Sequence, residues 1–240
     1  MMIQPGSPEQ WILASLTLGI IIFKVVLLIV LLAKFNTKRR EQGIVALYFL
    51  KAVIILFLCL AISRSLALTF DFFLTYLDMD LYVVGYNIYF WKLAMVISNI
   101  GNLAVLYTLD TKVLGKKLKY IPEIIMAVGL VVILFFPVSE KPDFVLLSQI
   151  LIVAMAVSAI IPLVFLYLGI KIPGLRKTAF LIFFGILIYI GAGLLVNGNT
   201  LDSIIKSSGV SIVVVYTLYL VIKLAGLSIL AYGTTKFKLS

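Results

Sequence analysis

Histidine is absent from the 240 residues, and cysteine occurs once, at Cys59. The chain therefore lacks the most common general base, the most common metal ligand and the usual pH switch of proteins. A single thiol forms no disulfide within the chain and builds no thiolate metal site. We expect no bound metal, and we expect Cys59 to be a small buried residue of an apolar helix.

Charged residues are also scarce, since they make up 12% of the chain while apolar residues make up 63%. Soluble domains average about a quarter charged and about half apolar residues, and no water-soluble fold hides so much apolar surface. Apolar runs of about 20 residues, the length that crosses a bilayer, recur between Trp11 and Tyr232. The composition predicts a multi-pass protein of the cell membrane.

The hydropathy pattern divides the chain into seven apolar segments, each long enough to cross the membrane as a helix. We expect an all-α membrane protein, a bundle of seven transmembrane helices that forms one domain over residues 1–240. The expected spans are 10–34, 44–69, 82–109, 118–137, 143–171, 176–197 and 209–233. Pro162 cannot donate a backbone hydrogen bond to the Ser158 carbonyl, which predicts a kink in the fifth span.

Lysine and arginine gather in alternate loops, and this alternation predicts the orientation, because basic residues near short loops stay in the cytoplasm. The alternate loops hold only Lys141 and Lys206 beside acidic residues. We expect the N-terminus outside and the C-terminus in the cytoplasm. The basic clusters are Lys34, Lys38, Arg39 and Arg40; Lys112, Lys116, Lys117 and Lys119; Lys171, Arg176 and Lys177; and Lys236 and Lys238.

These clusters account for the net charge of +10. A basic residue at a cytoplasmic membrane surface gains ~1 kcal/mol from anionic lipid. The expected partner of the basic loops is therefore the anionic headgroups of the lipid bilayer, and we expect no nucleic acid. The loops are too short to fold as a soluble effector domain, which leaves a role for a membrane or cytoplasmic protein partner.

Charged side chains inside the expected spans are candidates for function, because each costs ~3 kcal/mol near a helix centre. Lys24, Lys51 and Lys223 belong to the first, second and seventh helices, which are neighbours in a sequentially wound bundle. Glu123 in the fourth helix is the one acidic residue deep in a span. Either some of the lysines are neutral, or an anionic ligand or lipid headgroup enters. The alternative is that each lysine extends independently to the membrane surface.

Arg64 lies near the outer end of the second span, where its long side chain can reach the membrane interface. We interpret it as such a snorkelling residue. Asp71, seven residues later on the same helical face, is its candidate partner.

The third span carries the most polar helix face. Asn99 and Asn102 are three residues apart, a spacing that suits hydrogen bonds to neighbouring helices, but plain packing is the interpretation that we favour. Trp91 and Lys92 stand among aromatic residues that form either an interfacial belt or the wall of a pocket. The candidate ligand-binding residues are therefore Lys92, Trp91, Asn99, Asn102, Lys24, Lys51, Lys223 and Glu123.

Arg64 late in the second span and Trp91 early in the third, within YFWKLAMVISNIGN, resemble the seven-helix sensor modules that precede histidine kinases in prokaryotes. The resemblance extends over the bundle. It implies a receptor or sensor that binds a small or lipidic ligand among the outer halves of its helices. Because no kinase sequence follows, we expect signalling to pass through a separate partner.

Other functions fit parts of the pattern. Lys223 stands where microbial rhodopsins hold their Schiff-base lysine, but the second and third spans offer no carboxylate as counter-ion. We therefore expect no cofactor, and retinal only if Lys223 binds it. An anion transporter and a subunit of a membrane complex are the remaining alternatives. HExxH, Gly-x-Ser-x-Gly and close intramembrane aspartate pairs are absent, so we expect no catalytic residue and no enzyme.

Overall fold

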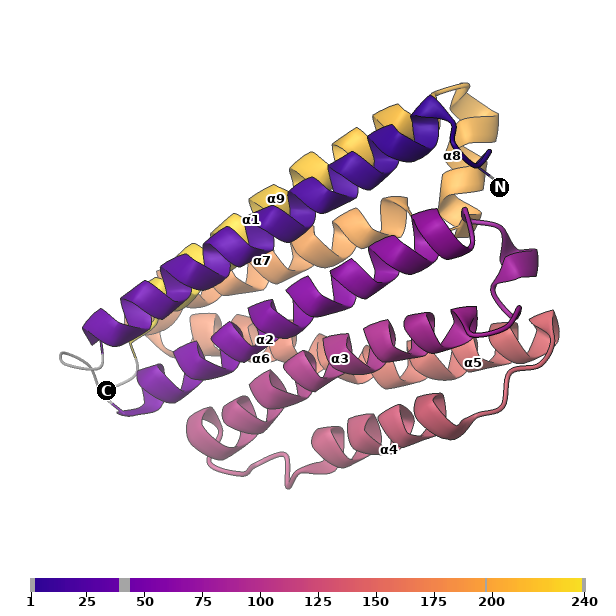
Figure 1. Cartoon of the computed structure of the whole chain (residues 1–240). Helices are drawn as coiled ribbons and strands as arrows, with labels where there is room; N and C mark the ends of the chain where they lie inside the picture. The colour runs from indigo at the N-terminus through magenta and orange to yellow at the C-terminus, as the bar shows by residue number, and fades with distance from the viewer. Residues whose placement is uncertain (1–2, 39–43, 197, 239–240) are drawn as a thin grey trace.

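The computed structural model describes residues 3–38, 44–196 and 198–238, which are helical without a β-strand (Figure 1). Among them are six helical segments long and apolar enough to cross a membrane, as expected of a multi-pass membrane protein. These segments are α1 (Pro8–Lys38), α2 (Ile44–Thr69), α3 (Asn87–Thr108), α5 (Lys141–Ala156) continued by α6 (Ile160–Lys171), α7 (Arg176–Leu195) and α9 (Ile212–Lys236). One π-helical turn extends α2 over Phe70–Leu74, and another extends α3 over Leu109–Val113.

The fourth expected span is shorter than predicted. Helix α4 (Ile121–Phe135) has 15 residues and reaches about 22 Å, less than the ~30 Å of hydrocarbon. Its start is fixed by Tyr120, which has a left-handed backbone conformation, and its end by Phe136, which is extended before Pro137. The described residues therefore contain six helices long enough to cross a membrane, and not the predicted seven. A membrane crossing by α4 remains a prediction.

An additional helix, α8 (Gly198–Ser208), lies between α7 and α9 and was not expected from hydropathy. Leu201 is 4% exposed and packs with Ile204 and Ile205 against the apolar cluster at the N-terminal ends of α1 and α9. The three side chains recur at the spacing of one helix face, so α8 is amphipathic.

The predicted kink in the fifth span is confirmed. A 3₁₀ turn at Val157–Ala159 separates α5 from α6, and Pro162 lies in the first turn of α6. The hydroxyl of Ser158 is buried there and has no hydrogen-bond partner in the described part of the chain.

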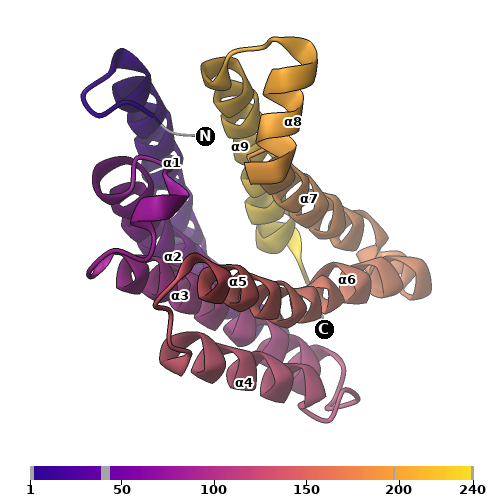
Figure 2. The same cartoon turned by 90° about the vertical axis from the view of Figure 1, so that its right-hand side faces the viewer.

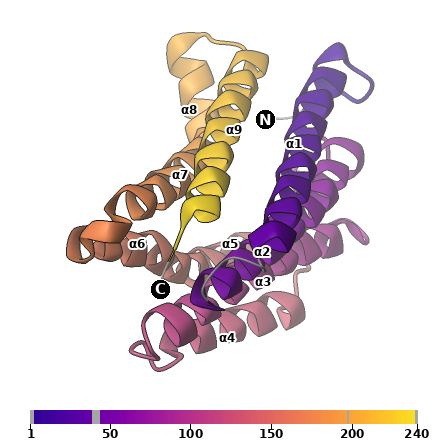
Figure 3. The same cartoon turned by 90° about the vertical axis from the view of Figure 1, so that its left-hand side faces the viewer.

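The helices pack in chain order, and α9 closes the bundle against α1. The views from the two ends show α1 and α2 on one side and α7 and α9 on the other (Figures 2 and 3). The C-terminus lies at the same end as the α3–α4 and α6–α7 connections, whereas the N-terminus lies at the opposite end with α8 (Figure 1). The described basic loops thus share one end. Arg39 and Arg40 lie outside the described residues, and the orientation in the membrane remains a prediction.

Helices α7 and α9 have the most extensive contact between any two helices of the described residues. A Cβ atom added to Gly226 would lie 2.6 Å from the backbone nitrogen of Tyr189, and one added to Gly185 would lie 2.6 Å from that of Leu230. Small residues of this kind let two helix backbones approach closely in a bilayer, where packing rather than apolar burial drives helix association. The two glycines therefore set the distance between α7 and α9.

Candidate functional site

Lys24 points from the middle of α1 into the bundle. Its side chain is 2% exposed, and Nζ donates a hydrogen bond of 2.8 Å to the carbonyl of Leu60 in α2. It shares the buried face of α1 with Thr17 and Ile20, which precede it by seven and four residues. The helical repeat therefore directs an ammonium group into the contact between α1 and α2.

Arg64 of α2 also points inward, so its interpretation as a snorkelling residue is wrong. Its side chain is 17% exposed, and Nη1 lies 3.7 Å from Oδ2 of Asp71. Nη2 donates to Oγ1 of Thr17 at 3.4 Å, and Nε is buried without a hydrogen-bond partner among the described residues. Asp71, in the π-helical turn that follows α2, is the candidate partner that the seven-residue spacing predicted.

Lys223 approaches this region from α9. Its Nζ donates to the hydroxyl of Tyr219 at 2.7 Å and lies 4.8 Å from the ring centroid of Tyr189 on α7. The guanidinium group of Arg64 also lies over the Tyr219 ring, with 5.9 Å between Cζ and the ring centroid. Aromatic faces attract such cations but carry no net charge. We call Lys24, Arg64 and Lys223 the cationic cluster.

In their protonated forms, the three groups of the cationic cluster carry more positive charge than their surroundings balance. Arg64 and Lys223 share the ring of Tyr219, and Lys24 contacts the α2 backbone at Leu60, one helical turn before Arg64. Within the described part of the chain, Asp71 is the one carboxylate that pairs with a member of the cluster. Asp71 offsets one positive charge of the three and leaves two. An arginine fork flanked by ammonium groups is suited to a carboxylate or phosphate.

Only two of the predicted ligand-binding residues meet in this cluster, Lys24 and Lys223. Lys51 is exposed on α2, and it precedes Leu60 by nine residues, about 13.5 Å along the helix. Glu123 is 7% exposed in the first turn of α4, and its carboxylate oxygens have no partner among the described residues. The prediction that Lys51 joins Lys24 and Lys223 is therefore wrong, and Glu123 does not pair with any of them.

Lys92 and Trp91 connect α3 to the helices on its other side. Lys92 is 5% exposed, and its Nζ donates to the carbonyl of Phe136 at 2.6 Å, directly after the last turn of α4. The Trp91 ring packs edge to face on Phe144 of α5, with centroids 5.0 Å apart. Both residues thus have structural partners away from the cationic cluster.

Tyr82 lies between the same aromatic residues and the acidic end of the cluster. Its ring centroid is 4.8 Å from that of Phe70 and 5.1 Å from that of Phe144. Burial, followed by the negative charges of Asp71 and Asp78, raises the pKa of the Tyr82 phenol. The loop from Thr75 to Tyr86 contains no lysine or arginine and therefore supplies no positive partner to Asp71.

The asparagines of α3 form no side-chain hydrogen bond to a neighbouring helix in the described part of the chain. Asn99 is 2% exposed, and its Nδ2 donates to the carbonyl of Met95 in its own helix at 2.8 Å. Asn102 is half-buried and has no side-chain hydrogen bond in the described part of the chain. In the described residues neither asparagine donates a side-chain hydrogen bond to a neighbouring helix, which is consistent with the packing role favoured from the sequence.

A Lys92→Met variant tests the structural role of that lysine. We expect it to unfold at a lower temperature, with a loss of about 1 to 2 kcal/mol, because the buried carbonyl at the end of α4 loses its donor. Thermal unfolding followed by fluorescence in detergent measures this loss. A variant as stable as the unmodified protein would show that the Lys92 ammonium group does not stabilise the end of α4.

Lys223 differs from the Schiff-base lysine of rhodopsins in its surroundings. Within the described residues its ammonium group pairs with no carboxylate, and it shares the ring of Tyr219 with Arg64. A protonated Schiff base at this position would lack the counter-ion that stabilises it.

No protein-family model, no curated protein and no solved structure matches the chain, so the assignment of function depends on the cationic cluster.

Proposed function

We propose that the chain is a receptor-like membrane protein that binds a small anion at the cationic cluster. The observation that carries this proposal is the set of three inward-pointing basic side chains, Lys24, Arg64 and Lys223, which faces a single carboxylate. Burying unbalanced charge in an apolar bundle is costly. A bound carboxylate or phosphate offsets that cost, and hence the protein is more stable with the anion than without it.

Binding at this position also offers a route to a signal. The cluster draws one residue each from α1, α2 and α9, so an anion attracts three helices towards one point. A ligand shifts a conformational equilibrium only when it binds one arrangement more tightly than another. In this proposal the anion favours the arrangement with closely spaced helices, and a partner protein responds at the end that carries the basic loops.

Inorganic phosphate and acetate are the probes for this proposal. We expect each to stabilise the protein in zwitterionic lipid nanodiscs in proportion to the logarithm of its concentration above Kd, by ~2.7 kcal/mol at a hundredfold excess over Kd. Arg64→Gln is expected to weaken the response at least tenfold, since the guanidinium is the donor with fork geometry. Fluorescence-detected thermal unfolding over an anion titration is the measurement.

Lys51→Met is the matched control, because it removes a basic residue of the same helix from an exposed position. Its response to phosphate and acetate is expected to equal that of the unmodified protein. Stabilisation that rises linearly with anion concentration, rather than with its logarithm, would indicate a general salt effect. That result, or an equal loss in both variants, would contradict anion binding at the cluster.

Anion transport is the second candidate function. It is favoured by the position of the cluster, since Lys24 and Lys223 lie near the middle of α1 and of α9. Transporters hold their substrates near the bilayer midplane. Uptake of labelled phosphate into proteoliposomes, lost in Arg64→Gln, would support transport. Saturable binding with no uptake would support the receptor instead.

A further inference from the structure

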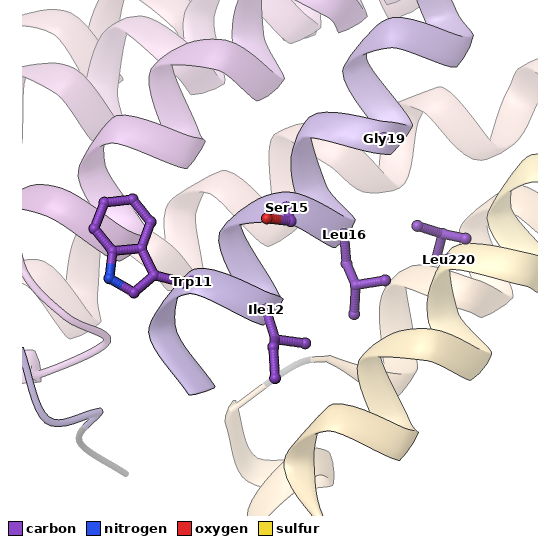
Figure 4. Close-up of a pocket in the computed structure, with 6 residues that line it drawn as sticks. All are labelled: Trp11, Ile12, Ser15, Leu16, Gly19 and Leu220. Atoms are coloured by element: carbon purple, nitrogen blue, oxygen red, sulfur yellow. The ribbon is translucent and has the colours of Figure 1, made fainter. Parts of the chain in front are cut away.

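A groove of about 430 Å³ lies between α1 and α9 near the end of the bundle that carries the N-terminus (Figure 4). Its lining is almost wholly apolar, and Ser15 contributes the one side-chain hydroxyl. Figure 4 shows Leu16 of α1 and Leu220 of α9 pointing towards one another, with Ile12 beside them. The residues that line the groove are Trp11, Ile12, Ser15, Leu16, Gly19 and Leu220.

The groove adjoins the cationic cluster. Thr17, which accepts a hydrogen bond from Arg64, directly follows Leu16. Tyr219, which accepts one from Lys223, directly precedes Leu220. Leu220 and Lys223 are three residues apart and so share one face of α9, whereas Lys24 lies about 140° around α1 from Gly19. The apolar groove therefore adjoins the cationic cluster on the α9 side, at Lys223.

The groove also faces the hydrocarbon region. Trp11 and Ile12, at its outer end, are 56% and 44% exposed, and both belong to a span of the membrane. A small water-soluble anion gains nothing from contact with an apolar surface. A molecule with one apolar chain and one negatively charged end complements both the apolar groove and the cationic cluster. Five of the residues that line the groove belong to α1 and one, Leu220, belongs to α9.

From this charge complementarity we propose that the ligand is a long-chain carboxylate, a single-chain lipid anion that enters sideways from the bilayer. Its chain lies in the groove between α1 and α9, and its carboxylate contacts the cationic cluster. This inference rests on the proposed anion-binding function and names the chemical class of the ligand.

Trp11 provides a reporter at the edge of the groove, where its ring lies on the side of α1 away from Leu220 (Figure 4) and packs on Phe73; the chain has only one other tryptophan, Trp91. In a Trp91→Phe background, a long-chain carboxylate brominated in mid-chain is added to nanodiscs of zwitterionic lipid. Bromine quenches a tryptophan that it contacts. We expect saturable quenching of Trp11 by the carboxylate, and weak non-saturating quenching by its methyl ester, which enters the bilayer without a charge.

Two aromatic substitutions on α1 separate the groove from the surrounding lipid. Ser15→Phe fills the groove and is expected to weaken saturable quenching at least tenfold. Leu18→Phe is the matched control, since Leu18 is 48% exposed on the same helix and does not line the groove. Arg64→Gln is expected to weaken quenching as strongly as Ser15→Phe. Unchanged melting temperatures in Ser15→Phe and Leu18→Phe confirm that both variants fold.

Quenching by the ester equal to that by the acid, or a Ser15→Phe variant that binds normally, would overturn the inference. Saturable quenching by a brominated two-chain phospholipid would overturn the assignment to a single-chain ligand. If phosphate and acetate bind but the brominated carboxylate does not, the groove is not part of the site and anion binding stands. If none of these anions binds, the proposed function itself is wrong.

Discussion

A Gly226→Ala variant is expected to be less stable than the unmodified protein by about 3 kcal/mol, the upper range for an overpacked contact. The added Cβ would lie 2.6 Å from the backbone nitrogen of Tyr189 and 3.0 Å from the carbonyl oxygen of Gly185. Both neighbours are backbone atoms of α7, so no side chain can rotate to make room. The whole helix must move, and the contacts of α7 with α9 are lost along its length.

Gly191→Ala is the matched control within α7, because no described atom lies within 4 Å of a Cβ placed there. That variant is expected to be slightly more stable, since alanine is favoured over glycine inside a helix by about 1 kcal/mol. Thermal unfolding of the two variants side by side measures the difference and its sign. A Gly226→Ala protein as stable as Gly191→Ala would show that α7 and α9 do not approach each other at these glycines.

An Asp71→Asn variant is expected to lose about 3 kcal/mol, because removing one partner of a buried ion pair leaves the other charge uncompensated. The effect is large here because Arg64 then faces Lys24 and Lys223 with no carboxylate in the described part of the chain to offset them. The anion response is expected to increase at the same time, since the site gains one positive charge. Thermal unfolding with and without phosphate measures both effects.

The double variant Asp71→Asn with Arg64→Gln provides the control for this pair. It removes both charges, and we expect it to recover most of the lost stability. Its melting temperature therefore lies above that of Asp71→Asn alone. If the double variant is as unstable as the sum of the single variants, the two side chains do not interact across the 3.7 Å that separates them.

The hydropathy of the sequence was sufficient to locate the long helices. The first expected span, 10–34, falls within α1, and the last, 209–233, overlaps α9 almost completely. The pattern overestimated α4, because apolar residues continue up to Pro137 whereas the helix ends before it. It missed α8, since a search for runs of about 20 apolar residues overlooks a short helix with one apolar face.

The candidate site could be predicted in part. Lys24 and Lys223 are conspicuous as charges in apolar runs, but depth alone does not show which way a side chain points. At 100° per residue, Lys51 and Arg64 are about 140° apart around α2, whereas Arg64 and Asp71 are about 20° apart. The helical repeat therefore contained the signal that joins Arg64 to Asp71 and separates Lys51 from them. The partner of Lys92 could not be predicted, because it is a backbone carbonyl of another helix.

The glycine contact between α7 and α9 also determines which helices move together. With backbones touching at Gly185 and Gly226, Tyr189 and Lys223 belong to one rigid pair of helices. Lys24 belongs to α1, which faces α9 across the apolar groove. Any change in groove width therefore changes the separation of the two ammonium groups. In the proposed site, the binding of an apolar chain in the groove and the neutralisation of the two ammonium groups therefore depend on the same movement. That movement is the displacement of α1 relative to the α7–α9 pair.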